Sequence, residues 1–282
     1  MTDALRIGVL MPEVLGTYGD SGNAVILAQR ARWRGYEAQI VHVGVSEAIP
    51  AELDIYTLGG GEDIAQTIAS RHLAGDTGLK RAVEAGKPVL GVCAALQVLG
   101  NWYSDAQGNR TPGAGLLDVV TMPQGARAIG ELATTPALDG LTEVLLGFEN
   151  HGGATMLGQQ VRPLGYVQAG IGNGLPGVAP KIDQGISQEA GAKAGVVLDT
   201  EVPDGYRARI DGKAVEGAVC GSIVATYMHG PVLARNPQLA DYLLAGVLGD
   251  LEPRQVEGVD RLRAERLQAC EIQQKARRAT EG

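Results

Sequence analysis

Residues 87–100 read KPVLGVCAALQVLG, an apolar run followed at once by good helix formers, with Cys93 at the junction. The run around Pro88 and Gly91 predicts a short buried strand, and the residues after the cysteine predict a helix that ends at Gly100. A thiol at such a junction lies over the first turn of a helix, where unpaired N–H groups and the helix dipole favour a thiolate or an oxyanion. The segment therefore predicts a nucleophile elbow. A buried structural cysteine is the alternative interpretation.

The residues that precede this segment alternate between strand and helix. The sequence predicts strands at residues 5–11, 36–43 and 54–58, and helices at 23–33, 64–72 and 76–86. This alternation indicates an α/β fold with a doubly wound, mixed and largely parallel sheet. Ligands of such sheets bind beyond the carboxyl ends of the strands, where we expect Asp20, the glycine loop at 59–61 and Cys93 to lie.

The overall composition narrows the class of protein. The chain has 282 residues, of which 45% are hydrophobic, enough for one large domain or two modest ones. A net charge of −8 and an aromatic content of 4% disfavour nucleic-acid and anionic-membrane partners. Three widely spaced cysteines predict neither a disulfide framework nor a metal site. Because residues 1–10 do not resemble a secretion leader and no 18-residue apolar run occurs, we expect a cytoplasmic protein.

A glycine loop, Gly59-Gly60-Gly61, precedes the helix predicted at 64–72. The exposed N–H groups of such a loop bind an anion or an oxyanion. The loop lacks the lysine and hydroxyl residue of a phosphate-binding loop, and the following Glu62 and Asp63 repel phosphate. Oxyanion binding therefore fits better than nucleotide binding, and a plain turn is the alternative.

The pattern changes after Gly100 to short strand-like pieces of antiparallel or mixed character, at residues 115–122, 126–133, 143–149 and 154–157. Arg127 lies among them, and its guanidinium group is able to clamp a carboxylate, although a surface arginine is the simpler interpretation. Glu149, Asn150 and His151 place charge, amide and imidazole together at a strand end. This clustering predicts the rim of a site, to which we also assign Asp20.

The last strand of the domain carries a second candidate. Residues 222–228 predict a strand that places His229 at its carboxyl end. Because Cys93 also follows a strand, parallel pairing would bring the imidazole and the thiol together and permit thioester chemistry on an amide or acyl substrate. The flanking sequence predicts a glycine-rich surface excursion at 158–194, short strands at 195–198, 206–210 and 214–219, and a helix at 236–248.

Several of these segments resemble one known family. Residues 91–100 (GxCxxxQxLG) and 226–231 (TYxHGP) are similar to the two signature segments of class I glutamine amidotransferases of the cobyric acid synthase type. Residues 18–23 (YGDxGN) and 148–153 (FENHGG), with Arg127 and the glycine loop, resemble its GatD branch, the glutaminase subunits of lipid II isoglutaminyl synthase. The resemblance spans roughly residues 5–248. It implies an amidotransferase domain at 1–249, followed by a charged, helical tail at 250–282.

The resemblance implies hydrolysis of L-glutamine to glutamate and ammonia. Cys93 would attack the carboxamide, and His229 would accept and return the proton. The backbone N–H groups of Ala94 and Gly60 would bind the oxyanion. Residues assigned to glutamine binding are Arg127, Gln97 and Gly59.

The same resemblance implies a partner. No cofactor is expected in this chain, because ATP and Mg²⁺ would bind to a MurT-like ligase that amidates the D-glutamate of the lipid II stem peptide. We expect the 250–282 tail to contribute to that interface. One alternative keeps the chemistry but changes the acceptor to a cobyrinate-type corrinoid, although the chain contains no synthetase domain of its own. Another is a catalytically silent α/β scaffold.

The sequence departs from the family pattern at three places. The usual class I triad has a glutamate two residues beyond the histidine, where this chain has Pro231, so the group that orients His229 stays open. Ala95 replaces the usual glycine of the elbow. Residues 158–221 form a longer stretch than in the family, and the sequence assigns no role to it.

Overall fold

The computed structural model describes residues 4–105, 107–174 and 202–281. Its first sheet has the order β12-β13-β4-β3-β1-β2. Five of these strands run parallel, and only the edge strand β12 is antiparallel to its neighbour. The strands are β1 (Leu5–Leu10), β2 (Ala38–Val43), β3 (Ile55–Leu58), β4 (Val89–Val92), β12 (Ala218–Cys220) and β13 (Ile223–Thr226).

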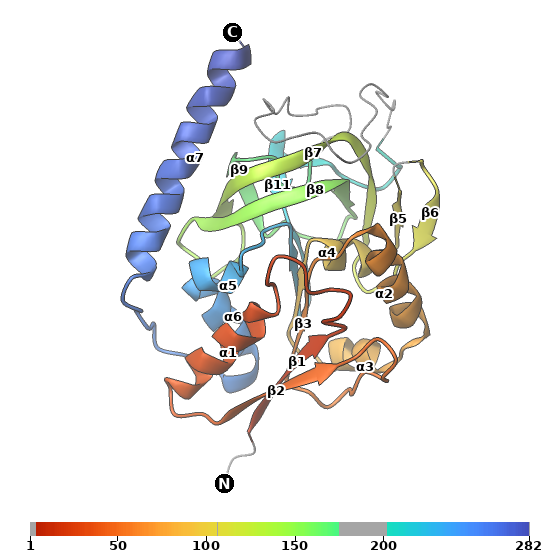
Figure 1. The fold of residues 1–282 in the computed structure, drawn as a ribbon, viewed down its shortest axis with the longest axis vertical. Coiled ribbons are helices and arrows are strands. Elements are labelled where there is room, and N and C mark those ends of the chain that lie inside the picture. Colours follow the sequence, from red (N-terminus) through yellow and green to blue (C-terminus); the bar gives the residue numbers. More distant parts are fainter. Residues whose placement is uncertain (1–3, 106, 175–201, 282) are drawn as a thin grey trace.

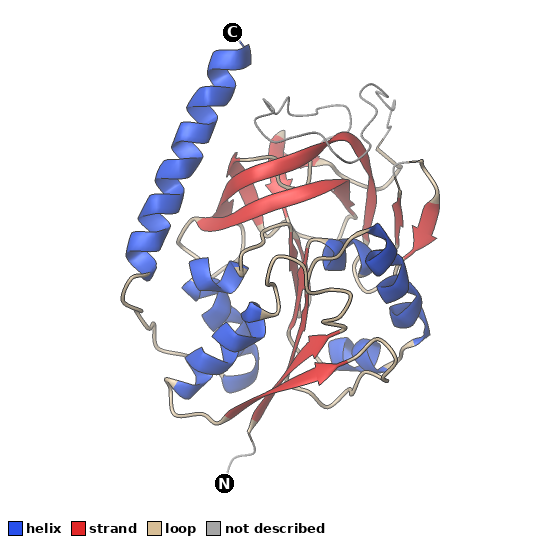
Figure 2. Ribbon diagram, in the orientation of Figure 1, coloured by secondary structure: helices blue, strands red, loops and turns tan. Residues whose placement is uncertain are grey.

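Helices cover both faces of this sheet (Figures 1 and 2). One face carries α1 (Gly22–Arg32), α5 (Val232–Arg235) and α6 (Pro237–Leu248); the other carries α2 (Asp63–Gly75), α3 (Gly78–Glu84) and α4 (Ala94–Val98). Every residue of β3, β4 and β13 is buried, as expected for parallel strands packed between two helical layers. The predicted doubly wound α/β fold is therefore confirmed.

A second, mainly antiparallel sheet lies across the carboxyl ends of the first (Figure 1). Its strands are β5 (Trp102–Ser104), β6 (Arg110–Pro112), β7 (Val119–Pro136), β8 (Leu145–Leu157), β9 (Gly165–Ala169), β10 (Arg209–Ile210) and β11 (Lys213–Glu216). The order is β10-β11-β9-β7-β5-β6, with β8 paired to β7. This sheet brings segments that are distant in sequence to the edge where the predicted site residues lie.

The sequence predicted four short pieces where the structure has two long strands, β7 and β8. The pairing of β7 with β8 shifts register between Pro123 and Ala128, because a proline cannot donate to the ladder and a bulge follows it. In β8, the adjacent Gly152 and Gly153 interrupt the apolar alternation without ending the strand. Local sequence breaks were therefore wrongly interpreted as strand ends.

Part of the predicted surface excursion at 158–194 is buried. Leu164 and Asn173 are both 0% exposed, and β9 lies between them. Residues 175–194 and the strand predicted at 195–198 lie outside the described residues. The described part of this stretch therefore belongs to the second sheet.

The charged C-terminal tail contains α7 (Val259–Glu281), which packs beside the second sheet (Figure 1). Arg263 donates to the main-chain oxygen of Val144 at 2.9 Å, and Arg266 pairs with Glu131 at 3.0 Å. Cys270 is only 3% exposed against the same sheet. The first half of α7, from Val259 to Cys270, thus packs on the domain. That the tail also contacts a partner stays a prediction.

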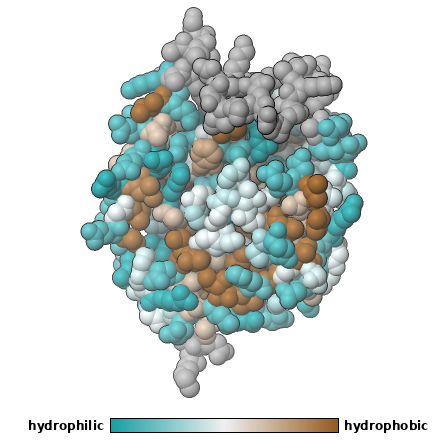
Figure 3. Space-filling view, in the orientation of Figure 1, coloured by the Kyte–Doolittle hydropathy of each residue, from teal (hydrophilic) through white to brown (hydrophobic). Residues whose placement is uncertain are grey.

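The surface of the described residues is mixed in character. On the face seen in Figure 3, hydrophobic residues form patches between hydrophilic ones. Exposed apolar side chains include Val25 and Ile64, which are 54% and 80% exposed. Within the described ranges, no helix is long and apolar enough to cross a bilayer.

Candidate active site

Cys93 lies at a strained turn between β4 and α4. Its φ of 55° and ψ of −106° place it in a region that non-glycine residues rarely adopt, at a cost of about 1–3 kcal/mol. The Cys93 N–H donates to the main-chain oxygen of Thr226 at 2.7 Å, so the turn is anchored to β13. A Cβ added at Gly91 would lie 3.0 Å from Cδ1 of Leu99 and 3.4 Å from the Cβ of Ala95. Because Gly91 has no Cβ, it leaves room for the alanine that departs from the family pattern.

His229 follows β13 and is held by both main chain and side chain. Its N–H donates to the Phe148 oxygen at 2.8 Å, which joins it to β8. Its ring Nδ1 lies 2.9 Å from Oδ2 of Asp20, which comes from the loop between β1 and α1. Both side chains are almost completely buried, at 1% and 2% exposure. Asp20 is therefore the group that orients the imidazole.

The glycine loop brings these three side chains close together. A Cβ added at Gly60 would lie 2.7 Å from Cε1 of His229, 3.3 Å from Oδ2 of Asp20 and 3.4 Å from the Cβ of Cys93. The position therefore requires glycine. The Gly60 N–H donates to Oδ2 of Asp20 at 2.9 Å, so in this structure it supports the carboxylate instead of facing the cavity.

The surroundings of His229 favour its charged form. Burial by itself lowers the pKa of His229, but the hydrogen bond and charge of Asp20, together with interactions with Cys93, raise it to about 9. These interactions therefore favour the imidazolium form of the ring.

Pro231 occupies the position of the usual triad glutamate and has a packing role. A Cβ added at Gly22 would lie 2.5 Å from Cγ of Pro231, so the proline packs directly on the start of α1. The next residue of the predicted motif, Asn23, accepts a hydrogen bond from the Leu233 N–H at 3.0 Å. Gly22 and Asn23 therefore hold the Asp20 loop against the segment that follows His229.

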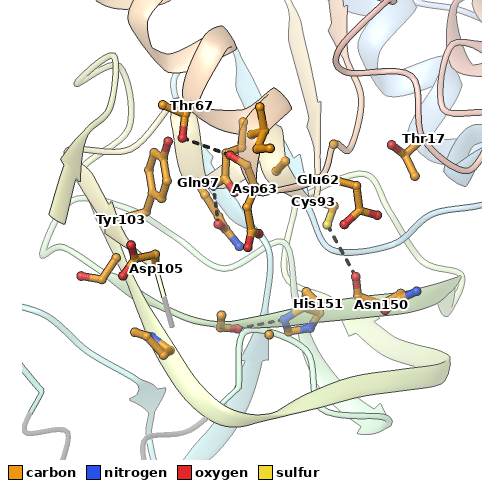
Figure 4. Close-up of a pocket in the computed structure, with 18 of the residues that line it drawn as sticks. Thr17, Glu62, Asp63, Thr67, Cys93, Gln97, Tyr103, Asp105, Asn150 and His151 are labelled. Carbon is orange, nitrogen blue, oxygen red and sulfur yellow. Dashed lines mark hydrogen bonds between the residues drawn. The ribbon is translucent and has the colours of Figure 1, made fainter. Parts of the chain in front are cut away.

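Cys93 and His229 line one cavity of about 410 Å³. Figure 4 shows the Cys93 thiol directed toward Asn150 of β8, with His151 beside it. The sulfur lies 3.9 Å from the main-chain oxygen of Asn150. The lining also includes Arg127, Gln97, Glu62, Asp63, Tyr103 and Asp105.

A polar chain crosses the mouth of the cavity. Nε of Arg127 donates to Oδ1 of Asn150 at 2.8 Å, and the Asn150 amide donates to the hydroxyl of Tyr18. The Tyr18 ring lies 4.7 Å from the His229 ring, centroid to centroid. This chain joins β7, β8 and the Asp20 loop above the thiol, and places an arginine where a substrate carboxylate can reach it.

The floor of the cavity is fixed by a second hydrogen-bonded group. Gln97 accepts from the Gln66 side-chain amide at 2.6 Å and donates to the Tyr227 hydroxyl at 3.1 Å. His151 stacks on the Tyr227 ring at 3.7 Å, and its Nδ1 lies 2.8 Å from the Gly153 oxygen. Gln97 and His151 are therefore held in place before any substrate arrives.

Four predicted site residues do not line the cavity: Gly59, Gly60, Asp20 and Glu149. Gly59 packs so closely that an added Cβ would lie 2.3 Å from the Leu15 oxygen. Glu149, which we expected at the rim with Asp20, is fully buried and accepts hydrogen bonds from the Ile171 and Gly172 N–H groups. Of the four residues predicted at the rim, only Asn150 and His151 reach the cavity.

Sequence reasoning missed the roles of Tyr18 and Gln66. Tyr18 stood inside the motif at 18–23, and its φ of 60° marks it as unusual only once the backbone is known. Gln66, one buried polar residue of a helix, gave no local signal. In the part of the chain that the structure describes, no three His, Cys, Asp or Glu side chains gather as a metal site.

Comparison with known proteins identifies the family. Residues 6–237 match the CobB/CobQ-like glutamine amidotransferase domain. The chain is 31% identical to the lipid II isoglutaminyl synthase (glutamine-hydrolyzing) subunit GatD of Staphylococcus aureus, over 85% of this chain and 83% of that protein. The corresponding subunit of Streptococcus pneumoniae is 28% identical, over 86% and 80%.

A cobyric acid synthase of Sphingopyxis alaskensis is 28% identical over 75% of this chain, but the match spans only 36% of that longer protein. The family match covers both catalytic candidates, Cys93 and His229. The chain therefore belongs to the CobB/CobQ-like glutamine amidotransferase domain family and is a glutamine-hydrolysing enzyme.

Proposed function

We propose that this chain is the glutaminase subunit of a lipid II isoglutaminyl synthase. In this role it hydrolyses L-glutamine and supplies ammonia to a MurT-like, ATP-dependent ligase that amidates the D-glutamate of the lipid II stem peptide. The observation that carries the proposal is the cavity that Cys93 and His229 share. Cys93 stands at the elbow, and Asp20 orients the imidazole of His229. The similarity to two GatD subunits over most of both chains supports the choice of acceptor.

The chemistry follows from the charge state of the pair. The Cys93 thiolate attacks the side-chain carbonyl carbon of glutamine, and a C–S bond forms as the carbonyl oxygen becomes an oxyanion. His229 gives its proton to the amide nitrogen, the C–N bond breaks, and ammonia leaves a γ-glutamyl thioester. Water then loses a proton to His229 and attacks the thioester, and glutamate departs as the C–S bond breaks.

Backbone N–H groups would stabilise the oxyanion. Ala94 is the first residue of α4, where N–H groups have no acceptor within the helix. Gly60 was the other predicted donor, but its N–H supports Asp20 in this structure. Its neighbour Gly61 lines the cavity and is the better placed second donor.

Glutamine would be oriented by the residues at the cavity mouth. Arg127 would pair with the α-carboxylate of glutamine, exchanging its present contact with Asn150 for a charged partner. Gln97, held by Gln66 and Tyr227, would line the side-chain pocket. Polar side chains at both ends of the cavity suit a small zwitterion such as glutamine.

The first experiment tests the nucleophile. Cys93→Ala in the ligase complex is expected to lose at least about 1,000-fold of ammonia release from glutamine, because no other thiol lines the cavity. A glutamine-mimicking electrophile should label Cys93 irreversibly. The matched control is Cys220→Ala, which removes a partly exposed free cysteine outside the cavity. An active Cys93→Ala enzyme would reject the assignment.

The second experiment tests the acceptor. The chain would be purified with its partner and supplied with glutamine, ATP, Mg²⁺ and either lipid II or a cobyrinate-type corrinoid. We expect ATP-dependent amidation of lipid II only, and an ammonia release rate that rises when the ligase is present. Amidation of the corrinoid would replace the proposal by the cobyric acid alternative. We place both subunits in the cytoplasm, where ATP is available.

A further inference from the structure

Among the described residues, no strand pairs with Tyr227 and Met228, which lie between β13 and His229, to satisfy their backbone donors. The N–H of Tyr227 donates to a carboxyl oxygen of Glu216 at 2.8 Å, and the N–H of Met228 donates to the hydroxyl of Thr226 at 3.0 Å. Side chains thus replace a sheet ladder in the residues that directly precede the catalytic histidine.

Glu216 is the fixed point of this arrangement. It is the last residue of β11 and is 0% exposed. Its Oε1 accepts from Tyr227 and also from the Thr226 hydroxyl, at 2.7 Å. The same hydroxyl accepts from Met228, so one carboxyl oxygen determines the path of three consecutive residues.

The same strand end anchors the nucleophile. The main-chain oxygen of Thr226 accepts the Cys93 N–H at 2.7 Å and so restrains the strained elbow. The Tyr227 hydroxyl holds Gln97 on the first helix after the elbow. A shift of residues 226–228 would therefore move the imidazole and the thiol relative to each other.

The electrostatic surroundings of Glu216 favour a neutral carboxyl group. Burial raises its pKa from the ordinary value of 4.5 to about 7; hydrogen bonds from Thr226 and Tyr227 oppose the rise, and the charge of Glu149 on β8 adds to it. Its Oε2 has no partner among the described residues. Because the folded pKa is raised, the stabilising contribution is complete below pH 4.5 and is lost as the pH rises through about 7.

We propose that Glu216 is a positioning residue for the catalytic pair: its buried carboxyl group fixes residues 226–228 and thereby sets the geometry of Cys93 and His229. The inference rests on the glutaminase chemistry proposed above and assigns a role to a strand from the second sheet. Glu216 touches neither the substrate cavity nor the reacting atoms, so it acts only through the strand end that it holds.

Three variants separate this role from general destabilisation. Glu216→Leu removes the acceptor, and Thr226→Val removes only the hydroxyl link; both should lower kcat by at least tenfold, with KM changed less than about twofold. Glu216→Gln keeps an acceptor oxygen and should stay within about threefold of wild type. The wild-type kcat profile should show an inflection near pH 7, which Glu216→Gln should lack because glutamine does not titrate.

A second readout does not depend on glutamine. The rate of Cys93 alkylation by iodoacetamide, followed against pH by mass spectrometry, reports the thiol–imidazole pair directly. We expect a displaced profile in Glu216→Leu and Thr226→Val and a wild-type profile in Glu131→Gln. That control weakens the ion pairs of Glu131 with Arg235 and Arg266, away from the cavity.

The outcomes distinguish the two proposals. If wild type releases no ammonia from glutamine but the alkylation profile shifts in Thr226→Val, the proposed function fails and the positioning role stands. Wild-type turnover and alkylation in a folded Glu216→Leu or Thr226→Val protein would overturn the positioning role. If Glu216→Leu does not fold, Thr226→Val and Glu216→Gln decide, because both keep nearly the same side-chain volume.

Discussion

The two sheets contribute to the site in different ways. The parallel sheet supplies Cys93, His229 and Asp20, all of them buried and held by strand ends or by the loop after β1. The second sheet supplies Arg127 and Asn150 at the exposed mouth of the cavity, close to the bulge in β7. Under the proposed function, the parallel strands would position the reacting groups, while the irregular antiparallel sheet would present the groups that recognise glutamine.

This comparison predicts which kinetic constant each region controls. Changes in the parallel sheet should lower kcat, and changes at the mouth should raise KM. Glu216 sharpens the comparison, because it belongs to the second sheet but should act on kcat through residues 226–228.

Asp20→Asn should have the largest effect of the three variants considered next. Loss of the charge removes the main interaction that raises the pKa of His229, so the pKa should fall from about 9 toward 6.5. Below its pKa the ring is an imidazolium, and therefore the alkaline limb of the kcat profile should move to lower pH. At pH 8 the lower pKa alone reduces the imidazolium fraction about 30-fold, and with the loss of the ring's orientation we expect kcat to fall about 1,000-fold. NMR titration of the imidazole, assigned with His229→Gln, measures the shift.

The stability of the wild-type protein should depend on pH through this pair, and Asp20→Asn should lack that dependence. Since the folded pKa of His229 is raised, the stabilisation from its pair with Asp20 is complete below pH 6.5 and is lost as the pH rises through about 9. Asp241→Asn is the matched control, because it disrupts another, partly buried ion pair, with Arg30, outside the cavity. An unchanged imidazole titration in Asp20→Asn would remove the orienting role from Asp20.

Gly60→Ala should have the next largest effect. The added methyl group would meet Cε1 of His229 at 2.7 Å and must displace the ring from the thiol. We expect kcat to fall on the order of 100-fold, with a smaller change in KM. Gly75→Ala is the control, since a Cβ there meets no atom within 4 Å. Wild-type turnover in Gly60→Ala would show that the imidazole need not occupy its observed position.

Arg127→Ala should have the smallest effect and should act mainly on KM. Loss of one charged hydrogen bond to the α-carboxylate should raise KM for glutamine by about tenfold, with kcat nearly unchanged. Arg162→Ala serves as the control because that arginine is exposed and 4.0 Å from its only ionic partner among the described residues. A fall in kcat without a change in KM would contradict the division between the two sheets.

The elbow and the strand before His229 were predictable because their signals are local. An apolar run, a cysteine and a helix former are adjacent in sequence, and parallel strands necessarily end at the same sheet edge. The strand breaks in β7 and β8 were mispredicted for the same reason, because Pro123 and the glycines of β8 disturb the local pattern while long-range pairing continues through them.

The sequence by itself determined the fold class, the nucleophile candidate and its histidine partner, because these depend on patterns within a few neighbouring residues. Only the tertiary structure assigned Asp20 to His229, across 209 positions, and Glu216 to the strand end before it. The sequence around Glu216, KAVEGAVC at 213–220, carries no information about which donors the carboxyl group will meet. Those partners are fixed by how the two sheets pack, since burial favours hydrogen bonds between polar groups that are distant in sequence but near in space.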